Sequence, residues 1–455
     1  MAKKLFGKIQ QPDSGEPVSN GASTDAISAV TMDVGRRRLI QQLAAGGVLG
    51  IAGIGTMGSA SARLSSGLSA GTSQNSATYS RSEGFDETQM FTRPANTFGR
   101  AVALDETTLV VGYGEFEGGL ERTAYVFERG SCGEWVMQQT VSPSIGFPDV
   151  AEGFGKSIVV EGDWMIIGAP EARVMRGTAF VFHRSTDGIW RERQSIAFYD
   201  PDGGLTTSIA FDGETAAFGG PIKTEDYPGR VRIYQREGDG TFVEKQLLKS
   251  PEQSESNFDG FGRSAAIDDG TLVVGAFSYR NDEGAAYSFD QDSNGDWTRP
   301  QQISTRDEVG ETIDLDGNVA VLGAPFEVAE TPNYAGAAYV YERGPAGEWV
   351  ETQRLTGPEP ESYDLFGWAV TIDEETILVS APCGSRPPDQ SRPRTIYVYE
   401  REGDGTWRLQ QALTLTEQIR RQRFGHTLAL HDETLVAGAP SIVPFNDGSA
   451  YVFER

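Results

Sequence analysis

The chain has 455 residues, which suits two or three ordinary domains or one large repeat domain. Its formal net charge of −26 excludes a basic surface of the kind that binds nucleic acid, and its 55 glycines are typical of tight turns and short strands rather than long helices. Two cysteines are too few for a disulfide framework.

The first 84 residues do not have the pattern of a folded domain. Residues 1–34 are polar and lack periodicity, so we interpret them as a disordered leader. Residues 35–62 join consecutive arginines, at 36–38, to a Gly- and Ala-rich apolar run that ends in a small-residue cleavage pattern. This segment resembles a twin-arginine export signal, with an uncleaved membrane anchor as the alternative. Residues 63–84 predict a linker.

A four-strand pattern begins at residue 98 and ends near residue 143. The runs AVAL, LVVG, AYVFER and WVMQQ are short and rich in β-branched or aromatic residues. An acidic turn, a variable loop and a Gly-containing hairpin separate them in that order. Such runs between turn residues predict strands rather than helices.

The same pattern is repeated to the end of the chain. A turn similar to Gly-Ala-Pro closes the second strand of every copy, beginning at Gly112, Gly168, Gly219, Gly275, Gly323, Ser380 and Gly438. A Phe-Gly pair precedes most first strands, at Phe98, Phe154, Phe261, Phe366 and Phe424. Val309-Gly310 is a weakened copy, and the third repeat fits worst, with Leu205-Thr206 at this place. The spacing of about 50 residues is that of a four-stranded propeller blade, so we predict an all-β, seven-bladed β-propeller.

The two ends of the repeat region are complementary. The last copy stops one strand short, at residue 455. Residues 87–94 match residues 351–358, which form the fourth strand of an earlier copy. The N-terminal strand should therefore complete the last blade and close the ring, which removes the exposed edges of an open stack.

These motifs resemble the FG-GAP repeat β-propeller, which is also found in integrin α subunits, and the resemblance covers residues 85–455. In integrin-like members, it implies a Ca²⁺ loop between the first and second strands of a blade. Here those turns are short and acidic, and only residues 314–318 resemble a clipped version of the loop. Ca²⁺ takes six to eight oxygen ligands, which so tight a turn cannot supply.

A separate Ca²⁺ candidate lies in the hairpin of the fourth repeat. Asp290, Asp292, Asn294 and Asp296 alternate along the chain around a glycine, as the start of an EF-hand loop does. The distant bidentate Glu of that motif is missing. A solvated acidic hairpin is the alternative.

Although the chain as a whole is acidic, six arginines are grouped in and after the sixth repeat. Arg386, Arg392 and Arg394 occupy its loop between strands two and three, and Arg420, Arg421 and Arg423 occupy the connection that leaves it. The strand order places both segments on one face, where the resemblance to integrin-like propellers also implies ligand binding. Guanidinium groups suit carboxylate, sulfate or phosphate, so we predict an anion site. Neutralisation by neighbouring acids is the alternative.

Catalytic motifs are lacking, and we name no catalytic residue. The histidines, at 183, 426 and 431, fall at unrelated places in their repeats and should not converge on a metal. No nucleophile elbow or phosphate-binding loop occurs in the repeats. Cys132 and Cys383 fall on opposite faces, so we expect two free thiols.

Together these features predict an exported, monomeric binding or adhesion propeller at the cell surface or outside the cell. Its partner would be a protein or a carbohydrate, anionic ones included, and not nucleic acid. No transmembrane segment would remain after signal cleavage. Most of its 39 basic residues are arginine, and an acidic, Lys-poor surface favours adaptation to high salt over an ordinary acidic secreted protein. A polysaccharide lyase or hydrolase, and a structural cell-surface module, are the alternatives.

Overall fold

The computed structural model describes most of the repeat region. The described ranges are 84–93, 97–113, 122–144, 151–171, 177–198, 205–221, 229–251, 260–278, 283–304, 309–328, 334–382, 393–415, 422–441 and 447–455. The predicted leader, export signal and nearly all of the predicted linker lie outside them. Within these ranges the regular structure is β-strand, and no helix is long and apolar enough to cross a membrane.

The strands form seven four-stranded antiparallel sheets, which we call blades 1 to 7. Blades 1 and 2 consist of β2 (Phe98–Leu104), β3 (Thr108–Tyr113), β4 (Thr123–Arg129), β5 (Trp135–Val141), β6 (Ser157–Glu161), β7 (Trp164–Ala169), β8 (Thr178–Arg184) and β9 (Trp190–Ala197). Blades 3 and 4 consist of β10 (Ser208–Phe211), β11 (Thr215–Gly220), β12 (Arg230–Arg236), β13 (Phe242–Lys249), β14 (Phe261–Asp268), β15 (Thr271–Ser278), β16 (Glu283–Gln291) and β17 (Trp297–Ser304).

Blades 5 and 6 consist of β18 (Thr312–Asp316), β19 (Val319–Ala324), β20 (Ala337–Arg343), β21 (Trp349–Leu355), β22 (Val370–Asp373), β23 (Thr376–Ala381), β24 (Thr395–Arg401) and β25 (Trp407–Thr414). Blade 7 consists of β26 (Thr427–His431), β27 (Thr434–Ala439), β28 (Gly448–Glu454) and β1 (Asp86–Arg93).

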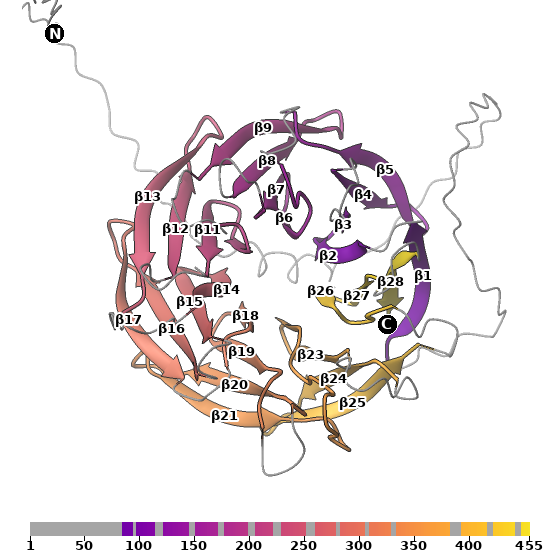
Figure 1. The fold of residues 1–455 in the computed structure, drawn as a ribbon, viewed down its shortest axis with the longest axis vertical. Helices are drawn as coiled ribbons and strands as arrows, with labels where there is room; N and C mark the ends of the chain where they lie inside the picture. Colours follow the sequence, from indigo (N-terminus) through magenta and orange to yellow (C-terminus); the bar gives the residue numbers. More distant parts are fainter. Residues whose placement is uncertain are drawn as a thin grey trace, which may run out of the picture. The chain divides into compact units, whose positions relative to one another are not determined.

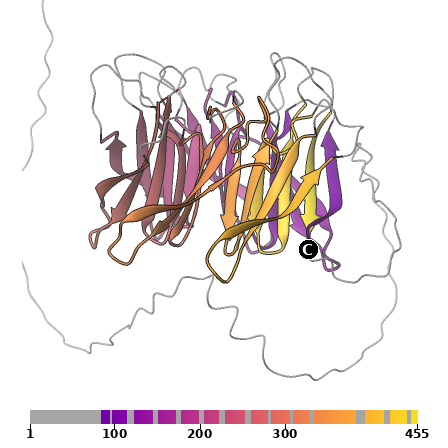
Figure 2. The same cartoon turned by 90° about the horizontal axis from the view of Figure 1, so that it is seen from below.

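The blades stand around a central axis, with the first strand of each innermost and the fourth outermost (Figure 1). Seen from the side, the strands run between two faces of the ring (Figure 2). We call the end with the first-to-second turns and third-to-fourth hairpins the turn face, and the opposite end the loop face. The predicted seven-bladed propeller is thus confirmed.

Blade 7 is built from both ends of the sequence. The strand β1 pairs antiparallel with β28, from Asp86 opposite Glu454 to Arg93 opposite Gly448. The order in this sheet is β1-β28-β27-β26, so the N-terminal strand takes the outermost place (Figure 1). This confirms the predicted closure of the ring.

The hydrophobic core lies between neighbouring blades. Every described residue of a second strand such as β27 is buried, because that strand has a blade packed on both of its faces. Outer strands such as β5 alternate buried and exposed residues, since one of their faces meets solvent. One cluster joins Val126 of blade 1 to Met165 and Phe180 of blade 2, and comparable clusters lie between other blades.

Glycines of the Phe-Gly turns allow each blade to approach the one before it. Gly155 has a φ of 86°, in the left-handed region that favours glycine. Its carbonyl oxygen lies where a Cβ on Gly112, at the end of β3 in the preceding blade, would have to be. The carbonyl of Gly367 stands in the same relation to Gly323 of β19. The two glycines of the repeat therefore form one backbone contact between blades.

A glutamine on most outer strands links the strand to the next blade. In blade 1, Gln139 Nε2 donates to the carbonyl of Trp190 (2.8 Å), and Gln139 Oε1 accepts from the Trp190 N–H (3.0 Å). The same two-bond clasp crosses the ring closure twice. Gln89 of β1 binds the backbone of Trp135, and Gln411 of β25 binds the backbone of Phe85, which stands in the tryptophan's place.

Arginines at the ends of third strands add ion pairs between blades. Arg401 Nη2 lies 2.8 Å from Glu342 Oε1 of blade 5, and its guanidinium lies over the ring of Trp407. Arg129 pairs across the ring closure with Glu454 at 2.9 Å. Each pair is partly exposed and stabilises the fold by less than about 1 kcal/mol. These ion pairs also neutralise the arginine charges on the turn face.

The third repeat predicts a stabilising substitution. Thr206 stands where other blades have the glycine, and its φ is 75°, a strained value for a β-branched residue. Its hydroxyl is buried and has no hydrogen-bond partner among the described atoms. Thr206→Gly should raise the free energy of unfolding by about 1 kcal/mol in urea titrations. The reciprocal control, Gly367→Thr, should be strongly destabilising; an unchanged or lower stability for Thr206→Gly would contradict this account.

The glutamine clasp predicts that Gln89 of β1 stabilises the ring closure. Gln89→Ala removes both hydrogen bonds to Trp135 and leaves backbone groups without partners, at a cost of about 1–3 kcal/mol in chemical unfolding. Gln89→Glu keeps the acceptor and should lose less. Gln139→Ala is the matched control at an interface within the continuous chain. If Gln89→Ala were as stable as the wild type, the clasp would not contribute to closure.

Candidate functional site

The structure describes two of the six predicted site arginines. Arg386, Arg392, Arg420 and Arg421 lie outside the described residues, as does Cys383. Arg394 directly precedes β24 and is half-buried on the loop face. Arg423 precedes β26 on the same face, where its backbone N–H donates to the carbonyl of Pro440 at 2.8 Å. The anion site formed by all six residues stays a prediction.

Arg423 lies close to a second arginine that the sequence did not single out. Arg100 follows the glycine of the first Phe-Gly turn at the loop-face end of β2, and the positive charge of Arg423 contributes to lowering its pKa. Burial by surrounding protein atoms is the larger cause of this lowering, although the side chain keeps an exposed surface, and Glu171 opposes it. The two guanidinium groups therefore share one corner of the ring, at the inner edge of the loop face.

The residue after each Phe-Gly turn varies while the turn itself is repeated. These positions, which lie around the axis at the loop face, are Arg100, Lys156, Thr207, Arg263, Glu311, Trp368 and His426. Arg263 binds Glu311 of the next blade, with Nε 2.9 Å from Oε2, and Lys156 pairs with Glu171. Neither Arg100 nor Arg423 forms an ion pair with a carboxylate in the ranges that the structure describes, although Glu171, the partner of Lys156, is near enough to Arg100 to oppose the lowering of its pKa. The sequence already shows this variation, because the residue after the turn differs from repeat to repeat while the turn itself recurs.

His426 is the uncharged neighbour of the two arginines. Its Nδ1 accepts a hydrogen bond from Trp368 Nε1 at 3.2 Å, and the two ring centroids lie 5.7 Å apart. Burial, with the positive charges of Arg100 and then Arg423, lowers the pKa of His426 to about 3. The imidazole of His426 is therefore neutral over the physiological pH range. The positive charge at this corner comes from Arg100 and Arg423 and not from the histidine.

The predicted calcium hairpin joins β16 to β17, and two of its carboxylates already bind other groups of the protein. Asp290 Oδ1 lies 2.6 Å from Arg343 Nη2 of blade 5, so this carboxylate helps to join two blades. Asp292 Oδ1 accepts the backbone N–H groups of Asn294 (2.8 Å) and Asp296 (3.1 Å). No group of three His, Cys, Asp or Glu residues in the described ranges is arranged to hold a metal ion. Calcium binding at these four residues stays a prediction.

The short acidic turns on the turn face link successive blades. Asp105 Oδ2 accepts the N–H of Gly162 at 2.7 Å, and Asp268 Oδ2 accepts that of Gly317 at 2.7 Å. Asp316 and Asp373 bind the next turn in the same way, at 2.5 Å. These carboxylates are bound to backbone groups of the following blade, which gives the turns a structural role.

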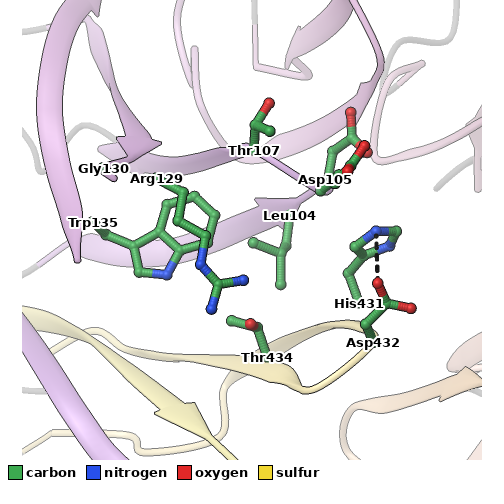
Figure 3. A pocket seen from close by; sticks show the side chains of 10 residues that line it. Leu104, Asp105, Thr107, Arg129, Gly130, Trp135, His431, Asp432 and Thr434 are labelled. Carbon is green, nitrogen blue, oxygen red and sulfur yellow. Dashed lines mark hydrogen bonds and ion pairs between the residues drawn. The ribbon is translucent and has the colours of Figure 1, made fainter. Parts of the chain in front are cut away.

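Blade 7 departs from this arrangement at its junction with blade 1. His431 stands where the other turns carry the acid, and it lies 3.8 Å from Asp432. A concave pocket of about 360 Å³ opens here, with Arg129 and Trp135 on one side and His431 and Asp432 on the other (Figure 3). Its lining mixes acidic, basic and aromatic groups and favours no single class of ligand. The pocket lies on the face opposite the arginine pair.

The remaining predictions about reactive side chains concern cysteine and histidine. Cys132 is a free, exposed thiol in the turn between β4 and β5. The three histidines do not share a site in the described structure: His183 packs on Trp164 in blade 2, and His426 and His431 lie at opposite ends of blade 7. The three histidines thus stand at separate places in their blades, as their positions in the repeats predict.

Comparison with known proteins identifies the repeat but not a ligand. Residues 349–399 match the model of the FG-GAP repeat. The matched segment runs from β21 into β24 and contains the Phe366-Gly367 turn, so an FG-GAP repeat spans the junction of blades 5 and 6. No curated protein matches the chain. A crystal structure of a protein from Lactobacillus plantarum is similar, at 13% identity and a TM-score of 0.42, over 71% of this chain and 86% of that one.

The lowered pKa of His426 predicts a specific pH dependence of stability. Between about pH 6.5 and pH 3 the unfolded chain binds a proton that the folded chain does not, so this contribution to stability is lost as the pH falls through that window. His426→Asn keeps an acceptor for Trp368 without titrating. From pH 7 to pH 4.5, the wild type should lose about 2–3 kcal/mol more unfolding free energy than this variant. Parallel pH profiles, with His183→Asn as the control histidine, would contradict the assignment.

Proposed function

We propose that this chain is a binding propeller that captures an anionic ligand on its loop face, at the corner formed by Arg100 and Arg423. The observation that carries the proposal is that these two guanidinium groups lie close together and are not held in ion pairs in the described structure. In a chain with a net charge of −26, neither forms an ion pair in the described ranges, while many other arginines are engaged by acids. Glu171, the carboxylate that acts on Arg100, forms its ion pair with Lys156 instead. Such forked donors suit carboxylate, sulfate or phosphate groups.

The four site arginines outside the described residues extend this proposal. Arg420 and Arg421 directly precede the described segment that contains Arg423, and Arg386 and Arg392 precede Arg394 in sequence. A ligand long enough to reach several of them would gain affinity from each charge. Because such contacts are partly exposed, their contribution should weaken as salt is raised.

The export signal and the acidic composition suggest where this binding takes place. We propose that the protein acts outside the cell or on its surface as an adhesion module, with an acidic surface adapted to high salt. The FG-GAP repeat supports a binding or structural propeller. An enzyme acting on polysaccharide is the second candidate, and chain cleavage of a bound ligand would distinguish it from a binding module.

The arginine pair predicts binding of small anions. Sulfate and phosphate should stabilise the full chain in thermal melts at constant ionic strength, and Arg100→Ala combined with Arg423→Ala should weaken their binding about tenfold or more. Arg191→Ala is the matched control, because Arg191 is exposed on the turn face beside Asp187. Equal losses in both variants would indicate a general charge effect. Unchanged binding in the double variant would refute the site.

A further inference from the structure

An arc of aromatic rings lies on the loop face next to the arginine pair. It comprises Phe326, Tyr334, Tyr363, Trp368 and His426, and we call it the aromatic arc. Phe326 contacts both Tyr334 and Trp368, each with ring centroids 6.2 Å apart. Tyr334 contacts Tyr363 at 5.6 Å, and Trp368 contacts His426 at 5.7 Å. The arc thus runs from blade 5 to blade 7 and ends beside Arg423 and Arg100.

The arc is held at the surface by a strained and well-connected backbone. Tyr334 has a φ of 57° and Tyr363 one of 67°, values that side chains other than glycine rarely adopt. The N–H of Leu365 donates to the carbonyl of Tyr334 (3.2 Å), and the N–H of Phe366 donates to that of Ala335 (2.9 Å). These bonds fasten the blade 5 loop to the connection between blades 5 and 6. Strain maintained in this way is typical of functional surfaces, where it fixes side chains before binding.

The rings are only partly covered by protein. Tyr334 is 36% exposed, and Tyr363, Trp368 and Phe326 are half-buried, whereas Phe277, which stacks under Phe326, is buried. The described structure records no hydrogen bond from the hydroxyl groups of Tyr334 and Tyr363. The arc therefore combines apolar ring surface with free polar groups, as amphipathic binding surfaces do.

We propose that the aromatic arc and the arginine pair together bind an acidic polysaccharide chain. This inference rests on the proposed anion site and names its ligand class. Sugar rings present C–H surfaces that pack against aromatic rings and hydroxyl groups that exchange hydrogen bonds with tyrosine. Carboxylate or sulfate groups on the same chain would meet Arg100 and Arg423 at the end of the arc.

An acidic peptide is the competing ligand, and the surface suits it less well. Arginine clusters can bind acidic peptide motifs, but peptide partners commonly gain most of their affinity from side chains inserted into desolvated pockets or from strands added to an exposed sheet edge. The arc instead offers a series of ring surfaces on the loop face, while the outer strands with their open edges lie around the outside of the ring (Figure 1). A chain of repeated sugar units can use several adjacent rings in succession.

The test compares three matched ligands by calorimetry on the full chain, at one low and one high NaCl concentration. They are oligogalacturonate, the same oligosaccharide with its carboxylates reduced to alcohols, and oligoglutamate of similar charge. A panel of other uronate and sulfated oligosaccharides is screened in parallel. The wild type should bind at least one acidic oligosaccharide at least tenfold more tightly than the neutral form and than oligoglutamate.

Variants then separate the two parts of the surface. Tyr334→Ala should weaken binding of the acidic oligosaccharide about tenfold while leaving sulfate binding intact, and Trp368→Ala should do the same if it folds. Arg423→Ala should abolish the preference for the acidic form over the neutral one. Trp164→Ala and Arg191→Ala, both on the turn face, are the matched controls and should change neither.

The outcomes distinguish this inference from the proposal on which it rests. If sulfate binds through the arginines but no acidic oligosaccharide in the panel does, the anion site stands and the polysaccharide inference falls. If the wild type does not bind sulfate, both the anion site and the polysaccharide inference are refuted. Binding of oligoglutamate as tightly as the oligosaccharides, unaffected by Tyr334→Ala, would identify an acidic peptide as the ligand and overturn the inference.

Discussion

The close approach of successive blades is the constraint on which this structure depends. At the loop face, the carbonyl of Gly155 occupies the space that a side chain on Gly112 would need, and Gly367 and Gly323 repeat the contact. At these two junctions neither position can carry a Cβ without strain, one for lack of space and the other because its φ is near 90°. Ser380 and Thr206 are the exceptions elsewhere in the ring. The Phe-Gly and Gly-Ala-Pro motifs are therefore two halves of one interface, and this explains why they occur together in the repeats.

That interface orients the blades, but it does not by itself close the ring. Closure requires that the first and last strands recognise each other across the whole sequence. The pairing of β1 with β28, the clasps made by Gln89 and Gln411, and the ion pair of Arg129 with Glu454 use the same contacts that join blades elsewhere. The seam is thus equivalent to the other junctions on its outer side. It differs on the turn face, where His431 replaces the acid that links neighbouring turns.

The fold could be predicted from the sequence because its determinants are local and repeated. Turn glycines, short β-branched runs and the match between residues 87–94 and 351–358 all specify the same ring, and the structure confirms it. The candidate site at Arg100 and Arg423 could not be predicted in the same way. Arg100 and Arg423 are 323 positions apart, and His426 has its pKa lowered by both, which depends on three-dimensional proximity. The acidic turns show the converse, since their carboxylates bind neighbouring backbone groups that only the ring brings near.

The position after each Phe-Gly turn shows how a rigid repeat can carry a specific site. The glycine contact fixes the backbone there, so each side chain leaves it from an equivalent place on the loop face, at the inner edge of its blade. Packing between blades does not depend on that side chain, and it varies from Arg100 to Glu311 to Trp368. Where neighbours are complementary, as Arg263 and Glu311 are, the charges satisfy each other. Around blades 6, 7 and 1 they are an indole, a neutral imidazole and a guanidinium, which do not neutralise one another, and this is the corner where we propose that an anionic ligand binds.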